Sequence, residues 1–230
     1  MRVSVLSSLA MAVLLSGCAR QPQQMMMGTA ETALRPGQGT IGVIMTPLPK
    51  VDTQFPGASC LLCIAAANAA HSTLTSYVQT LPHEDLPKLK DEVANRIRKR
   101  GIEATVINEE LKLDALADTG QSVQDLASKD FKPLKAKYNV DKLMVIDVTT
   151  LAVSRPYSAY IPTGVPHVVL EGKAYLVNLS DNRYELYRKV RVSRAADGQW
   201  DEAPKYPGLT NTYYQALELG KDDLLRPFSQ

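Results

Sequence analysis

The sequence has few of the residues on which catalytic and metal sites are most often built. Its 230 residues include only three histidines and three cysteines. The histidines are His71, His83 and His167, and the cysteines are Cys18, Cys60 and Cys63. No Gly-x-Ser-x-Gly elbow, His-Glu-x-x-His motif or P-loop occurs. We therefore expect a protein that is not an enzyme and that holds no metal and no cofactor.

The sequence also lacks a strong excess of either charge. Its 26 basic and 24 acidic residues give a formal net charge of +2, so the composition argues against nucleic acid as a partner. One basic run, Arg98 to Arg100, precedes Gly101 at the end of a predicted helix. Cations and glycine are both favoured at helix C-termini, so this run indicates the end of a helix.

Apolar runs long enough to cross a membrane are absent as well. The run at residues 3–15 is shorter than the roughly 20 residues that a membrane span needs. Arg2 followed by this run is typical of a signal peptide, expected over residues 1–17. The run ends in Leu15-Ser16-Gly17-Cys18, which resembles the bacterial lipobox. The resemblance implies a lipoprotein acylated at Cys18 with palmitate-type chains. Ala19 at the next position implies the outer membrane, with the protein facing the periplasm.

Residues 18–39 show neither a strand nor a helix period and contain repeated breakers, among them Pro22, Pro36 and Gly37. They are predicted to form a flexible tether between the lipid and a single globular domain over residues 40–230.

The fold prediction is built around one apolar run, residues 143–148, which reads as a strand covered on both faces. Further strands are predicted at residues 41–45 and 104–107, a hairpin at 168–192, and helices at 86–97 and 213–225. The expected class is α/β (α+β). We expect a single domain of two or three layers, in which a mixed sheet has its central strand near residues 142–150 and is accompanied by a C-terminal hairpin and flanking helices.

Residues 58–78 are rich in alanine, which favours a helix, and are either tightly packed in the core or an apolar surface that meets another chain. Cys60 and Cys63 open this segment as a Cys-x-x-Cys pair. In an oxidising compartment the pair is expected to form a structural disulfide. The alternative is a thiol-disulfide or metal-handling function for the same pair.

The loop at residues 154–167 joins two predicted strands and carries Arg155, Tyr157 and Tyr160, residue types that are enriched at protein interfaces. We expect these three to contact a partner, although a loop folded back onto the sheet fits equally well. A glycan-binding module would instead require Tyr157, Tyr160 and Trp200 to share one cleft.

Three segments carry a wider resemblance: residues 40–44, residues 134–145 with the turn Asn139-Val140-Asp141, and residues 173–190. They are similar to the domain shared by the curli secretion lipoprotein (CsgG-like), the amino-terminal domain of TolB and LpoB. The resemblance implies contacts in an outer-membrane assembly, either for secretion or transport or as an accessory of a peptidoglycan synthase. The expected partners are the outer membrane, through the lipid, and an envelope protein or a second copy of the chain.

Overall fold

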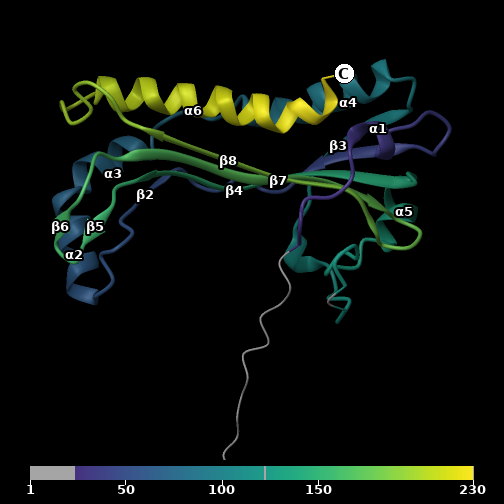
Figure 1. Ribbon diagram of the computed structural model, residues 1–230, viewed down its shortest axis with the longest axis horizontal. Helices are drawn as coiled ribbons and strands as arrows, with labels where there is room; N and C mark the ends of the chain where they lie inside the picture. The colour runs from purple at the N-terminus through teal and green to yellow at the C-terminus, as the bar shows by residue number, and fades with distance from the viewer. Residues whose placement is uncertain (1–23, 122, 230) are drawn as a thin grey trace, which may run out of the picture.

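The computed structural model of the chain describes residues 24–121 and 123–229. The predicted signal peptide and Cys18 lie outside the described residues. The structure confirms the expected class, because one mixed six-stranded sheet is flanked by helices (Figure 1).

The strand β4 (Lys142–Ser154) lies in the middle of the sheet, whose order is β3-β1-β4-β7-β8. Two short strands pair with the same edge of β4 in parallel: β1 (Ile41–Met45) along its first half and β2 (Asp52–Gln54) along its last three residues. Beyond β1, the strand β3 (Ala104–Glu110) is also parallel. The predicted central strand is therefore confirmed, and it continues well past residue 150.

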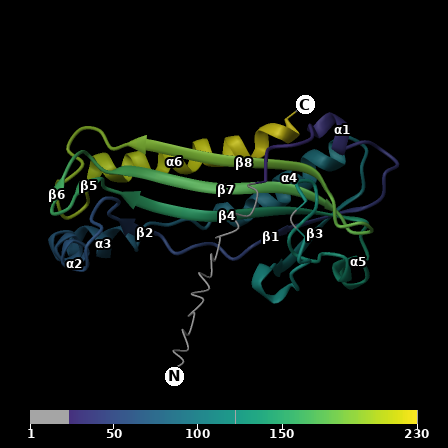
Figure 2. The ribbon, with the colours of Figure 1, turned by 60° about the horizontal axis from the view of Figure 1, so that its bottom comes forward.

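The other edge of β4 pairs with the predicted hairpin, which consists of β7 (His167–Asn178) and β8 (Tyr184–Ala195). Both pairings are antiparallel, and Asn182 in the turn adopts a positive φ of 66°. A β-bulge interrupts the β4–β7 ladder between Val148 and Thr150. The three strands form a long curved sheet that extends from one end of the molecule to the other (Figure 2).

Two long helices cover one face of this sheet: α4 (Leu89–Lys99), which follows the 3-10 turn η1 (Leu86–Lys88), and α6 (Pro207–Leu225), followed by η3 (Arg226–Phe228). Their buried side chains join Met144 and Ile146 of β4 in the main core. The positions of both helices match their sequence prediction, because their apolar residues recur at the spacing of one helical face.

Among the described residues, the short helix α5 (Pro133–Tyr138) and residues 111–121 and 123–131, which contain the 3-10 turn η2 (Leu113–Ala115), cover the opposite face near one end. Leu143 and Val145 of β4 pack there against Phe131 and Leu134. Successive residues of β4 thus enter two different clusters, which explains why the strand is apolar on both faces.

Residues 24–39, the described part of the predicted tether, lie against the domain and contain a helical turn. Met27 and Tyr187 exchange two backbone hydrogen bonds of 3.1 and 3.0 Å, so the segment begins against the edge of β8. The single turn α1 (Ala30–Ala33) is held by a capping box between Thr29 and Thr32, and Leu34 after it is buried in the main core. One turn contributes too few apolar residues to show a period, so the pattern missed it.

The bulge in β4 leaves little space opposite Gly172. A Cβ atom at this position would lie 2.8 Å from the backbone oxygen of Asp147 and 3.3 Å from Cα of Val148. We expect Gly172→Ala to lower the free energy of unfolding by about 1–3 kcal/mol, because backbone atoms of β4 would have to move. Urea unfolding measures this loss. Gly164→Ala, whose Cβ would meet only Cγ of Pro156 at 3.3 Å, is the control and should change stability far less. Equal effects would mean that the ladder adjusts freely.

Candidate contact surface

Exposed apolar side chains gather at one end of the molecule. They come from α2 (Leu61–Ala70) and from the loop that contains β5 (Tyr157–Ser158) and β6 (Ile161–Pro162). Leu61 is 87% exposed, Leu62 72% and Ile161 68%. The full set, here called the apolar end, is Leu61, Leu62, Ile64, Tyr160, Ile161 and Val165. Figures 1 and 2 show α2, β5 and β6 together at the end of the sheet away from α1.

The two stretches that form this end contain no Asp, Glu, Lys or Arg over residues 53–83 and 156–166. The helix α2 is apolar on nearly all sides, yet only Cys63 and Ala67 are buried. A helix of this composition is normally covered by protein or lipid. Of the two interpretations of this segment, the exposed side chains favour the apolar surface that meets another molecule.

Backbone hydrogen bonds fix the place of this end relative to the sheet. The chain leaving β2 runs beside the chain leaving β4, where Arg155 N donates to Gln54 O at 2.8 Å and Tyr157 N to Pro56 O at 2.8 Å. Gly57 has a φ of 92°, and a Cβ there would lie 1.9 Å from Tyr157 O. The helix α3 (Ser72–Val78) follows α2 and packs against β2. The apolar end is therefore an extension of the central strand.

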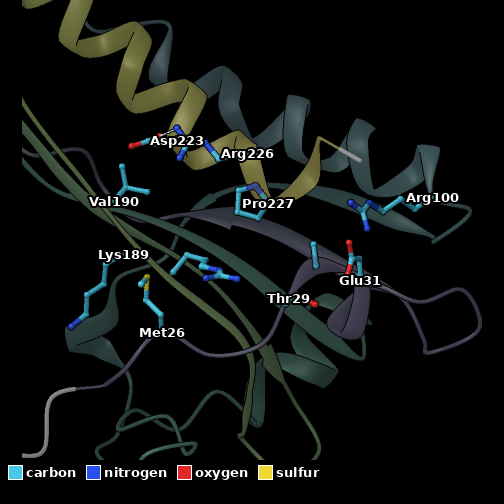
Figure 3. Close-up of a pocket in the computed structure, with 11 residues that line it drawn as sticks. Met26, Thr29, Glu31, Arg100, Lys189, Val190, Asp223, Arg226 and Pro227 are labelled. Atoms are coloured by element: carbon cyan, nitrogen blue, oxygen red, sulfur yellow. Dashed lines mark hydrogen bonds and ion pairs between the residues drawn. The ribbon is translucent and has the colours of Figure 1, made fainter.

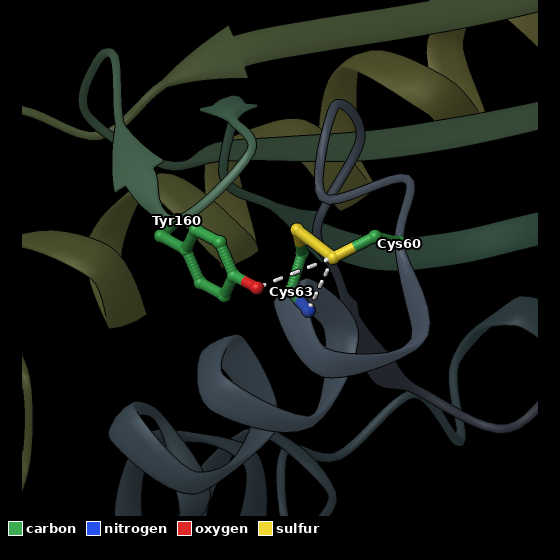
Figure 4. The surroundings of a disulfide bond; sticks show 3 residues. All are labelled: Cys60, Cys63 and Tyr160. Atoms are coloured by element: carbon green, nitrogen blue, oxygen red, sulfur yellow. Dashed lines mark hydrogen bonds between the residues drawn. A yellow bond between two sulfur atoms is a disulfide. The ribbon is translucent and has the colours of Figure 1, made fainter.

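Cys60 and Cys63 are joined by a disulfide at the start of α2. Cys60 is the N-cap residue, and its sulfur accepts the backbone N–H of Cys63 at 2.9 Å. The hydroxyl of Tyr160 lies 3.6 Å from the same sulfur (Figure 4). Cys60 is exposed and Cys63 is buried. The loop and the helix, far apart in the sequence, thus meet at the disulfide.

A polar network lies beneath the apolar end and centres on His71, the C-cap of α2. Its Nε2 lies 3.0 Å from Nη1 of Arg155 and 2.6 Å from the hydroxyl of Tyr157. A guanidinium can only donate, so Nε2 accepts and the ring is neutral with its proton on Nδ1. The ring of Phe55 stacks on the imidazole at 5.3 Å. Burial, and then the charge of Arg155, lower the pKa of His71.

The structure brings together all the described residues that the sequence singled out as contact or disulfide residues. Tyr160 is exposed on the surface, whereas Tyr157 is buried and belongs to the network below. Arg155 lies over the ring of Trp200, 4.8 Å from its centroid, in a cation–π contact. The buried Tyr157 ring offers no face to a sugar, so the cleft that a glycan module would require is not formed.

Sequence reasoning missed His71, Ile161 and Val165 at this end. The charge-free stretches at residues 53–83 and 156–166 were the signal that could have found them. In the described part of the chain, no three His, Cys, Asp or Glu side chains gather in a way that could hold a metal ion. Across residues 24–121 and 123–229, no helix combines the length and apolar character needed to cross a membrane.

Comparisons with known proteins add little. No family model and no curated protein matches the sequence. Protein XCC0632 of Xanthomonas campestris, of the family model DUF330, is 13% identical with a TM-score of 0.38, over 89% of this chain and 90% of its own. The PelC dodecamer of Paraburkholderia phytofirmans is 12% identical with a TM-score of 0.37, over 89% and 94%.

A third solved structure is lipoprotein GNA1162 of Neisseria meningitidis, which is 13% identical with a TM-score of 0.28, over 78% of this chain and 94% of its own. These similarities include a bacterial lipoprotein but are too distant to carry an argument about fold or function. The resemblance to the curli, TolB and LpoB domain stays a prediction.

The network beneath the apolar end predicts a pH dependence. The unfolded chain protonates His71 near its ordinary pKa of 6.5, whereas the folded chain does so only at lower pH. The contribution of His71 to stability is therefore fully present above about pH 6.5, and it is lost as the pH falls from there through the lowered pKa of the folded state. We expect wild type to lose more in melting temperature than His71→Gln between about pH 7.5 and pH 5.0. Circular dichroism at both pH values measures this, and parallel losses in the two proteins would contradict it.

Proposed function

We propose that this protein is a lipid-anchored protein of the outer membrane that faces the periplasm and acts without catalysis, by binding an envelope protein through its apolar end. The observation that carries the proposal is the exposed, charge-free surface on α2 and the β5–β6 loop. Folded proteins bury most of their large apolar side chains, so an exposed apolar patch of this kind marks an interaction site. The Leu15–Cys18 motif supports the lipid anchor.

The chemistry of the apolar end indicates what its partner must offer. Leucine, isoleucine and tyrosine without nearby charge bury best against an equally apolar surface. The contact of Tyr160 with Cys60 and the His71 network hold α2 and the loop in one arrangement, so little backbone freedom is lost on binding. These properties support a preformed docking surface for a protein.

The position of the anchor supports a partner close to the membrane. Gln24, the first described residue, lies beside Thr149, Glu171 and Arg191 on the uncovered face of the sheet. Gln24 follows Cys18 by six positions, and a chain of that length spans at most about 20 Å. A lipidated Cys18 would therefore keep the whole domain close to the bilayer. A secretion or transport assembly, or a peptidoglycan synthase to which this chain is an accessory, fits that location.

The docking role predicts that Leu61→Ser/Leu62→Ser loses its partner without losing its fold. A photo-crosslinking residue at position 64 in cells should give one defined protein adduct in wild type. The double variant should lose that adduct and keep its melting temperature, because both side chains lie on the surface. Leu219→Ser on α6, also an exposed leucine, is the matched control and should keep the adduct. Adducts only with lipid or only with a second copy would overturn the envelope-protein partner.

One observation favours a second candidate function, thiol-disulfide exchange. Cys60 is exposed at the first turn of α2 while Cys63 is buried behind it, and a helix N-terminus favours the thiolate. Against this function, residues 53–83 contain no lysine or arginine that could stabilise the thiolate of Cys60. The disulfide therefore fits a staple of the docking surface better than a reactive pair.

The two functions predict different behaviour of the disulfide. For a structural staple we expect a reduction potential below about −300 mV, and Cys60→Ser/Cys63→Ser should keep the position-64 adduct. For thiol chemistry the potential would lie between about −270 and −120 mV. Cys63→Ser alone would then trap mixed disulfides through Cys60, which the double variant could not form. Equilibration with glutathione and thioredoxin, followed by trapping in cells, separates the two.

A further inference from the structure

The outer edge of β8 is open over its second half. β8 is the last strand in the sheet order, and Figure 2 shows it as the outermost strand. Among the described residues, only Met27 pairs with this edge from Leu186 onward, through its two hydrogen bonds to Tyr187. Gln24 lies beside Thr149 on the uncovered face, so the chain has left the edge by that point. Residues Lys189–Ala195 of β8 are here called the open edge.

The backbone groups of the open edge point outward in a regular row. Tyr187 directs both its N–H and its C=O toward Met27, away from β7. In an antiparallel sheet every second residue directs these groups to the same side. The pairing of β8 with β7 has no irregularity between Tyr187 and Ala195, so Lys189, Arg191 and Ser193 also present theirs outward. Such a row is a template for one more strand.

The side chains of the open edge divide between the two faces of the sheet. Val190 and Val192 belong to the main core, whereas Lys189 and Arg191 lie on the uncovered face. Figure 3 shows Val190 directed toward α6 and Lys189 directed away from it, beside the pocket lined by α1, β8 and the C-terminal ends of α4 and α6. An added strand would therefore meet two cations on one face and α6 on the other.

The charge of this region is of one sign. After Glu185, β8 contains four basic residues and no acidic one. Arg191 pairs with Glu171 at 3.1 Å and its side chain stays 74% exposed, and Lys189 enters no ion pair with a described residue. Opposite charges directly across two paired strands are stabilising and like charges are destabilising. The open edge therefore favours an acidic strand and disfavours the β8 strand of a second copy.

A hollow of about 400 Å³ lies beside the same strand, between Arg194 and the exposed side of α6. Its lining includes two large side chains that are partly open to solvent, Tyr214 at 46% and Leu219 at 44%. A side chain on the α6 side of an added strand could cover both. Apolar side chains there would gain the most from burial.

We propose that the open edge binds an extended segment of a partner protein, in which apolar and acidic residues alternate, as an added antiparallel strand. Its backbone pairs with β8, its acidic side chains lie opposite Lys189 and Arg191, and its apolar side chains turn toward α6. Addition of a strand to a free sheet edge is a general mode of peptide recognition. The open edge shares no residue with the apolar end, so this inference does not rest on the proposed function.

A fluorescent peptide of seven residues, in which glutamate and valine alternate, tests the proposal against the full-length protein in mild detergent. Paired residues of antiparallel strands direct their side chains to the same face, so the glutamates carry the N–H groups that face β8. N-methylation of the glutamates should weaken binding at least about tenfold, because these hydrogen bonds are lost. The same peptide N-methylated at its valines is the matched control and should bind like the unmodified one. Fluorescence anisotropy measures both.

Variants of the protein test the two faces separately. Lys189→Glu/Arg191→Glu should reverse the preference, so that a peptide with lysine in place of glutamate binds better. Lys50→Glu/Lys112→Glu makes the same change of charge after β1 and β3 and should keep the wild-type preference. Leu219→Ser should weaken binding about threefold or more. Leu61→Ser/Leu62→Ser should bind the peptide as wild type does, which separates this surface from the apolar end.

Hydrogen exchange at single-residue resolution locates the bound peptide. The N–H groups of Lys189, Arg191 and Ser193 should exchange at least about tenfold more slowly in the complex. Those of Val190 and Val192, which face β7, are the internal control and should not change. The proposal is overturned if the peptide does not bind, if both N-methylated peptides bind equally well, or if the glutamate and lysine peptides bind wild type equally well. It is also overturned if the three N–H groups are already protected without peptide, because another strand would then occupy the edge.

Discussion

The fold depends on the pairing of β4 along both of its edges. β1 and β2 share one edge, β7 takes the other, and neighbouring side chains of β4 enter cores on opposite faces. Even its one acidic residue is buried with partners, since Asp147 accepts from Thr46 at 2.9 Å and pairs with Lys173 at 3.2 Å. Strand β8 and the helices α3, α4 and α6 pack on its immediate neighbours β1, β2 and β7.

The same strand explains why an apolar surface can be kept at one end. The chain that leaves β4 stays hydrogen-bonded to the chain that leaves β2, so the helix after one and the loop after the other are held together. The contact of Tyr160 with Cys60 and the contacts of His71 with Tyr157 and Arg155 hold the two segments together. Exposed leucines on a rigid support lose little entropy when they are covered, which is the property a docking surface needs.

The apolar end and the pocket lined by α1, β8 and the C-terminal ends of α4 and α6 lie at opposite ends of the sheet and differ in charge and in construction (Figure 1). One is uncharged and built from a helix and a loop. The other is concave, cationic and built around the last turns of two helices and the short α1. The segment that leads from the proposed anchor runs along the edge of β8 and lines the pocket with Met26.

The sequence by itself determined the strands and helices whose period is long enough to read: β1, β4, the β7–β8 hairpin, α4 and α6. Their burial follows from apolar residues that recur at every second position in the strands and at every third or fourth position in the helices. It could not predict α1, because a single turn has no period, nor the exposure of Leu61 and Leu62, because exposure depends on what else packs nearby. Only the tertiary structure placed Cys60 beside Tyr160 and left Nε and Nη2 of Arg100 buried without a partner among the described residues. Both depend on contacts between segments about a hundred residues apart or on different elements, which local sequence patterns do not record.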